Sequence, residues 1–188
     1  MANHVRTNMS FRNITEEGRA EFQRLMKLTD AGERAWFGLA FVGVDETTAD
    51  DVTDYNWNTA YIGPKWCYVE EYGEDYAIFV SAWGYPEDGI ALLLQQLEPV
   101  SEGVSVDVSF EDEMPNFVGA SVITSEGVED SVVWEWEELR DIFNERIEDL
   151  AEHWDEEEED WDDEGRDILQ ENMWEIISDL QSEWQGWN

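Results

Sequence analysis

The chain has 188 residues, of which 42% are hydrophobic and 13% aromatic, so it is large enough and apolar enough to bury the core of one sizeable domain. Its 47 acidic residues against ten Lys and Arg give a net charge of −37. That charge excludes direct binding to DNA, RNA or an anionic membrane, which depends on basic side chains, and leaves a basic protein surface as the complementary partner.

The first 44 residues are predicted to form a strand followed by a helix. Residues 3–14 alternate between apolar and polar side chains in the manner of a strand. Thr15 can cap a helix whose apolar face includes Phe22, and residues 29–32 end that helix. The apolar run at 35–44 fits either a helix end or a strand, and the pattern does not decide between them.

The middle of the chain carries the signals of a β-sheet with one helix. Residues 65–73 and 75–83 are rich in aromatic and branched side chains around a glycine, which predicts a hairpin. Residues 86–99 have a proline at each end and predict a helix. Further strands are predicted at 103–113, where apolar and polar residues alternate, and at 119–127. This order predicts an α+β fold with helices on one face of an antiparallel sheet.

Two amphipathic helices are predicted in the last 58 residues. Apolar residues recur at steps of three or four from Trp136 to Trp154, and again from Ile168 to Trp184. We therefore expect a C-terminal acidic helical hairpin at residues 131–188, added to an α+β domain at residues 1–130.

The connection between these helices, Glu152–Gly165, carries ten acidic residues around two tryptophans, Trp154 and Trp161. Acidic disordered segments are poor in aromatics, and tryptophan is the largest apolar side chain available. We therefore expect a folded turn in which both indoles pack.

Charge is spread unevenly along the chain. The first 44 residues have five acids and six bases, a net charge of +1, whereas residues 45–130 and residues 131–188 each carry −19. Halophilic adaptation would place acids on every surface, so this polarity disfavours that explanation.

Five motifs stand in order within residues 1 to about 128: "MANHVRTNMSF", Asn56–Trp57, Gly63–Trp66, Phe79–Pro86 and Ser109–Gly127. In this order and spacing they resemble the YubB-type ferredoxin-like domain of phage and plasmid proteins. The resemblance implies a ferredoxin-like α+β fold and a mobile-element setting, and it transfers no activity. Residues from about 131 onward lie outside it.

Residues suited to catalysis are scarce. The only histidines, His4 and His153, have no Cys or Ser nucleophile at a recognisable spacing, and no Gly-rich phosphate loop is present. Cys67 lies between two aromatic residues in a strand-like run, which favours a buried, inert thiol. We expect a protein that is not an enzyme, with no catalytic residue, cofactor or resident metal.

A calcium loop is the alternative hypothesis for part of the acidic connection. Asp160–Glu171 places acids at EF-hand positions one, three, five and twelve and Gly165 at position six, between two helical patterns. Against this, position five is Glu164, and position eight, where an apolar residue is usual, is Asp167. A solvated or partner-facing loop is therefore the preferred interpretation.

The preferred function is that of a non-enzymatic DNA mimic of phage type. Carboxylates three or four residues apart on a helix lie about 5–6 Å apart, a spacing comparable to that of phosphates along one DNA strand. Such a protein would occupy the nucleic-acid-binding surface of a basic host protein, as an anti-restriction, anti-defence, transcription or replication inhibitor. The predicted partner-binding residues are Asp155, Glu156, Glu157, Glu158, Glu159, Asp160, Asp162, Asp163 and Glu164.

Three further points complete these expectations. The alternative function is an accessory scaffold or interaction module whose acidity serves solubility.

The N-terminus lacks the apolar run of a signal peptide, and no stretch is apolar enough to span a membrane, so a cytoplasmic location is predicted. Oligomeric state and the identity of the target stay open.

Overall fold

The computed structural model describes residues 3–31, 34–113, 115–155 and 159–187. The chain divides into two compact units. The first consists of residues 1–114 and 119–132, and the second of residues 115–118 and 133–188.

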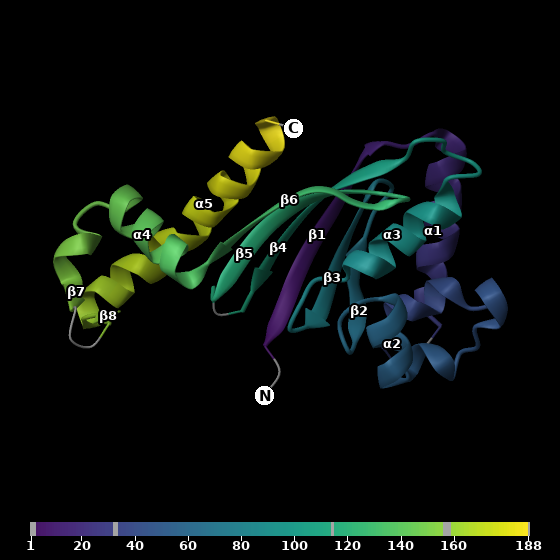
Figure 1. The fold of residues 1–188 in the computed structure, drawn as a ribbon, viewed down its shortest axis with the longest axis horizontal. Coiled ribbons are helices and arrows are strands. Elements are labelled where there is room, and N and C mark those ends of the chain that lie inside the picture. The colour runs from purple at the N-terminus through teal and green to yellow at the C-terminus, as the bar shows by residue number, and fades with distance from the viewer. Residues whose placement is uncertain (1–2, 32–33, 114, 156–158, 188) are drawn as a thin grey trace. The chain divides into compact units, whose positions relative to one another are not determined.

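The chain forms a six-stranded antiparallel sheet with the strand order β2-β3-β1-β4-β5-β6 (Figure 1). The strands are β1 (His4–Asn13), β2 (Cys67–Tyr72), β3 (Tyr76–Ala82), β4 (Ser105–Asp112), β5 (Phe117–Thr124) and β6 (Gly127–Glu135). The helices of the first unit are α1 (Glu16–Thr29), α2 (Tyr55–Tyr61) and α3 (Glu87–Leu97), with short 3-10 helices η1 (Phe37–Phe41), η2 (Val44–Glu46) and η3 (Asp51–Thr53). The predicted α+β class is confirmed.

The core of the first unit lies on one face of the sheet. Thr7 of β1 stands opposite Phe79 of β3 and Phe110 of β4, and all three side chains are buried. The ring of Phe79 lies 4.6 Å from that of Phe37 in η1. Helices α1 and α3 contact each other and η1, so these elements form one layer (Figure 1). Residues that alternate with this set on β1, such as Arg6, are exposed.

Helix α1 follows the prediction closely. The side chain of Thr15 accepts a hydrogen bond from the N–H of Gly18 at 3.0 Å, which satisfies a donor at the helix start. Phe22 is fully buried. The run at 35–44, which the sequence left undecided, forms η1 and part of η2 instead of a strand.

Helix α2 and strand β6 were not predicted from the sequence. Helix α2 lies in a polar stretch, and it starts because Asp54 accepts hydrogen bonds from the N–H groups of Asn56 and Trp57. Strand β6 has no strict alternation of buried and exposed residues, so its sequence gave no strand signal.

The second unit contains α4 (Trp136–Arg146), the 3-10 helix η4 (Leu150–His153), the two-residue strands β7 (Trp154–Asp155) and β8 (Asp160–Trp161), and α5 (Asp163–Trp187). The predicted second helix is confirmed by α5. The predicted first helix, from Trp136 to Trp154, is wrong beyond Arg146. Ile147 is extended and Asp149 has φ 63°, which ends the helix, although Leu150 still packs into the same core.

Within the described residues, no helix combines the length and the apolar character needed to cross a membrane.

Candidate partner-binding site

The described parts of the acidic connection, residues 152–155 and 159–165, form a folded structure rather than a plain turn between two helices. Strands β7 and β8 pair antiparallel, with Trp154 opposite Trp161 and Asp155 opposite Asp160. One residue pair further out, the N–H of Asp162 donates to the carbonyl of His153 at 3.0 Å. The connection therefore closes as a short β-ladder just before α5.

The two tryptophans hold this ladder on the helices. Trp161 is only 2% exposed, and its ring packs edge-on against Trp154 at 4.9 Å and against Trp136 at 5.7 Å. The guanidinium of Arg140 lies 5.2 Å from the Trp154 ring, within cation–π range. The expectation that both indoles pack at the end of the hairpin is confirmed.

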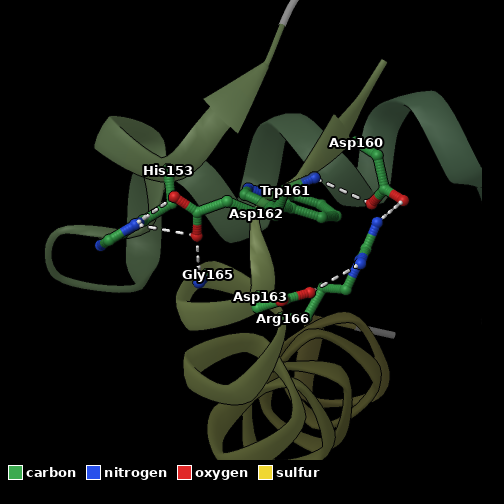
Figure 2. Close-up of polar contacts among 7 residues, drawn as sticks. All are labelled: His153, Asp160, Trp161, Asp162, Asp163, Gly165 and Arg166. Carbon is green, nitrogen blue, oxygen red and sulfur yellow. Dashed lines mark hydrogen bonds and ion pairs between the residues drawn. The ribbon is translucent and has the colours of Figure 1, made fainter. Parts of the chain in front are cut away.

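Asp162 fixes the start of α5. Its carboxylate accepts a hydrogen bond from the N–H of Gly165 at 2.8 Å and lies 3.1 Å from Nδ1 of His153 (Figure 2). The Gly165 N–H, followed by His153, lowers the pKa of Asp162 below its ordinary 3.8. The hydrogen bond that His153 makes to the Asp162 carboxylate in turn raises the pKa of His153 above 6.5. This is the geometry of a helix N-cap with an added ion pair.

Gly165 is required by close packing at this point. A Cβ added there would lie 2.6 Å from the Cβ of His153 and 3.0 Å from that of Trp161. Any larger residue here would displace the paired strands β7 and β8. Glycine therefore allows α5 to begin in close contact with them.

Arg166 forms ion pairs that link the first turn of α5 to strand β8. Its guanidinium bonds Asp160 at 2.7 Å and Asp163 at 3.2 Å (Figure 2). The bond to Arg166 lowers the pKa of Asp160. Asp160 and Asp163 are therefore held in place by the chain's own base.

The predicted partner-binding residues thus fall into three groups. Asp160, Asp162 and Asp163 carry the contacts just described. Asp155, Glu159 and Glu164 are exposed in the same segment. Glu156, Glu157 and Glu158 lie outside the described residues.

A second set of acids, which the sequence analysis did not single out, lies on α5. We name it the α5 ladder, and its exposed members stand every four residues: Asp163, Asp167, Glu171, Glu175, Asp179 and Glu183. Each step advances about 6 Å along the helix and turns about 40° around it. In the sequence this set is visible as an acid at every fourth position from Asp163 to Glu183.

The ends of the α5 ladder are neutralised by the chain and its middle is not. Asp163 pairs with Arg166, and Glu183 pairs with Arg146 at 3.1 Å. Among the described residues, no base forms an ion pair with the four acids between them, Asp167, Glu171, Glu175 and Asp179.

The residues considered for a calcium loop do not form one. Helix α5 begins at Asp163, so nine of the twelve residues from Asp160 to Glu171 are helical, and Gly165 is buried in the first turn instead of shaping a loop. Among the described residues, no three His, Cys, Asp or Glu side chains converge in a way that could hold a metal ion.

The three residues considered for catalysis lie in three different settings. Cys67 is fully buried in β2, and burial raises the pKa of its thiol well above the ordinary value, which keeps it protonated. His4 lies 3.6 Å from Glu113 and packs edge-on against Trp66. His153 is paired with Asp162, as described.

Comparison with known proteins returns no matching family model, no matching curated protein and no matching solved structure.

Proposed function

We propose that this chain is a non-enzymatic DNA mimic of phage type that occupies the nucleic-acid-binding surface of a basic host protein in the cytoplasm. The observation that carries the proposal is the α5 ladder. It is a row of exposed carboxylates at regular steps on a rigid helix, and its four middle members have no basic partner among the described residues.

Rigidity matters because an ordered array loses less conformational entropy when it binds. The N-cap at Asp162, the bonds of Arg166 and the packing of Trp161 fix the start of the helix that carries the ladder. A basic groove that normally holds a phosphate backbone would meet charges already in position. The contacts of Asp160, Asp162 and Asp163 therefore support the site by orienting it.

The charge density of α5 is lower than that of DNA, so we expect acids outside the α5 ladder to take part in binding as well. Duplex DNA carries one charge per about 1.7 Å of axis, or about 3.4 Å for each strand. With a rise of about 1.5 Å per residue, a carboxylate every four residues gives one charge per about 6 Å. The exposed acids Asp155, Glu159 and Glu164 raise the local density at the start of α5, so we place them in the same contact surface.

We also infer a ferredoxin-like arrangement of the YubB type for the first unit. Its first four strands lie in the order β4-β1-β3-β2, with α1 after β1 and α3 after β3, which is the βαββαβ pattern of that fold. Strands β5 and β6 would then extend the sheet beyond β4. The motifs that resemble the YubB-type domain lie within the same residues and support this inference.

Competition against nucleic acid tests the function. The full chain is immobilised, host proteins are retained at low salt and eluted at high salt, and each purified partner is titrated with nucleic acid in the presence of the chain. We expect a partner that loses nucleic-acid binding in proportion to the chain added. Partners that bind the chain and nucleic acid together would instead favour the scaffold alternative, which the acidity of residues 45–130 also fits.

A further inference from the structure

The unpaired acids of the α5 ladder form a single, evenly spaced row. Asp167, Glu171, Glu175 and Asp179 together span about 18 Å of the helix axis, with one carboxylate per about 6 Å. Glu164 is the one exposed acid that the structure describes on α5 outside the ladder, and it lies before this stretch. The spacing between charges on α5 is therefore uniform over these three steps.

Helix α4 does not add a second row of this kind. Its exposed acids are Glu137, Glu138, Asp141 and Glu145. Glu138 accepts a hydrogen bond from the N–H of Glu135 at 3.2 Å, and Asp141 pairs with Arg140 at 2.7 Å. The two that remain, Glu137 and Glu145, stand about 12 Å apart along the helix axis. Within the second unit, the regular row of unpaired helical acids is therefore that of α5 alone.

One row at this spacing corresponds to a single nucleic-acid strand whose bases are unstacked. In a duplex, the phosphates of each strand follow one another every about 3.4 Å along the axis, and the second strand brings the density to one charge per about 1.7 Å. Unstacking draws a strand out and moves its phosphates further apart, which is why single strands release fewer counterions per phosphate than duplexes do. The spacing of about 6 Å on α5 therefore fits an extended single strand better than a duplex.

An exposed tryptophan borders this row. Trp174 is 41% exposed, and it stands three residues after Glu171 and seven after Asp167, so the three side chains share one side of α5. Other apolar residues of α5, such as Ile177 and Leu180, are buried in the core cluster of the second unit. Trp174 thus lies outside the apolar stripe that holds α5 in its unit.

Trp174 also differs from most other tryptophans in what packs on its ring. Tryptophans whose rings contact another ring or a cation are Trp36, Trp57, Trp66, Trp83, Trp136, Trp154 and Trp161. Among the residues that the structure describes, no ring and no cation packs in this way on Trp174. Its indole is therefore available to stack against an aromatic side chain of a partner.

We propose, building on the function proposed above, that the α5 ladder mimics a single strand and that its target is a protein that binds single-stranded nucleic acid. Such proteins combine a basic groove that follows the backbone with aromatic side chains on which the bases stack. The four unpaired carboxylates enter the basic groove, and Trp174 stacks on an aromatic side chain in place of a base. Stacking tolerates every base because each has a π face, and the indole ring has one too.

Displacement of proteins from immobilised nucleic acid tests the proposal. Host proteins are bound at about 0.1 M salt to two resins of equal nucleotide content, one that carries single-stranded DNA and RNA and one that carries duplex DNA. Each resin is then eluted with increasing concentrations of the full chain. The released proteins are identified, purified and titrated with the nucleic acid of their resin in the presence of the chain.

Three substitutions at Trp174 separate stacking from the burial of apolar surface. Trp174→Phe keeps an aromatic face, Trp174→Leu keeps apolar surface without one, and Trp174→Ala removes both. Trp83→Gly is the matched control, because it removes an exposed indole from the first unit at a φ of 72°, which glycine adopts without strain. Far-UV circular dichroism verifies that each variant is folded.

We expect the natural chain to release proteins from the single-strand resin at lower concentrations than from the duplex resin. For these proteins, Trp174→Ala and Trp174→Leu should raise the concentration needed by about fivefold or more, the effect of losing one stacked ring, whereas Trp174→Phe and Trp83→Gly should change it by less than about twofold. Release from the duplex resin at equal or lower concentrations would overturn the single-strand inference and leave the proposed function standing. The same holds if Trp174→Leu acts as well as Trp174→Phe, or if Trp174→Ala acts like the natural chain. Release from neither resin would overturn both the inference and the proposed function.

Discussion

A partly buried hydrogen bond between Trp161 and Asn144 joins the acidic connection to α4. The indole Nε1–H of Trp161 donates to Oδ1 of Asn144 at 3.0 Å, and the two residues are seventeen apart in the chain. A tryptophan placed among carboxylates thus serves as an anchor, because its ring fills the core and its N–H finds an acceptor on the helix before it.

The first prediction concerns this anchor. Trp161→Ala should destabilise the second unit by about 3–5 kcal/mol, because it removes a large buried ring from a packed cluster. Asn144→Ala should cost about 0.5–1.5 kcal/mol, the net contribution of an ordinary hydrogen bond, because this bond is only partly buried. Amide hydrogen exchange over 139–146 and 168–180 measures both effects. Trp174→Ala, at an exposed site, should change exchange little, and a loss equal to that of Trp161→Ala would contradict the anchoring role.

The second prediction concerns pH. The raised pKa of His153 means that its pairing with Asp162 contributes fully below the ordinary His pKa of 6.5 and is lost as pH rises through the raised value. The lowered pKa of Asp162 contributes above 3.8 and is lost as pH falls through the lowered value. The pair should therefore stabilise the fold most between about pH 4 and 6.5.

Comparison with His153→Gln isolates this effect from the general repulsion among acids, which also changes with pH. The difference in unfolding free energy between the natural chain and the variant should be greatest in that window and shrink as the pH rises through the raised pKa of His153. A difference that stays constant from pH 5 to pH 9 would show that the imidazole charge plays no part.

The third prediction concerns calcium. Because α5 begins at Asp163, the residues from Asp160 to Glu171 cannot wrap around an ion as an EF-hand loop does. Millimolar Ca²⁺ and Mg²⁺ should raise the melting temperature by the same small amount through charge screening. Glu171→Gln should leave that response unchanged. A saturable shift specific to Ca²⁺ and abolished by this variant would reinstate the calcium hypothesis.

The sequence predicted helices and strands correctly where an element packs only one of its faces against the core. Strand β4 alternates strictly because one of its faces packs on the core, and α5 repeats its apolar residues because it buries one stripe. It was misleading at α4, where Ile147 and Leu150 continue the helical spacing although the backbone leaves the helix at Arg146. The spacing of apolar residues shows which side chains are buried. It can continue past the end of a helix when the chain changes direction but still packs against the same core.

The candidate site shows the same limit. Local composition identified the acidic connection and the role of its tryptophans, but it could not separate acids that hold the fold from acids that face solvent. That distinction depends on two sets of contacts, those of Arg166 with Asp160 and Asp163 and that of His153 with Asp162. These contacts form only when β7 and β8 pair.

The last prediction tests whether the exposed acids of the α5 ladder, and not net charge alone, carry the proposed inhibition of a nucleic-acid-binding target. The contact variant changes the four unpaired acids of the α5 ladder to amides, as Asp167→Asn, Glu171→Gln, Glu175→Gln and Asp179→Asn. A matched control removes the same number of charges from exposed positions in the first unit, as Asp50→Asn, Glu74→Gln, Glu102→Gln and Glu126→Gln. Both variants should keep the natural melting temperature or exceed it, because removing acids lowers self-repulsion.

The contact variant should lose most of its ability to displace nucleic acid from the target, whereas the control should keep most of it. Each lost contact also removes one screened charge pair, so the affinity of the contact variant should fall less steeply with salt than that of the natural chain. The measurement is a displacement titration at several salt concentrations, with far-UV circular dichroism to verify folding. Equal loss in both variants would mean that net charge alone drives binding, and no loss in either would remove the α5 ladder from the contact surface.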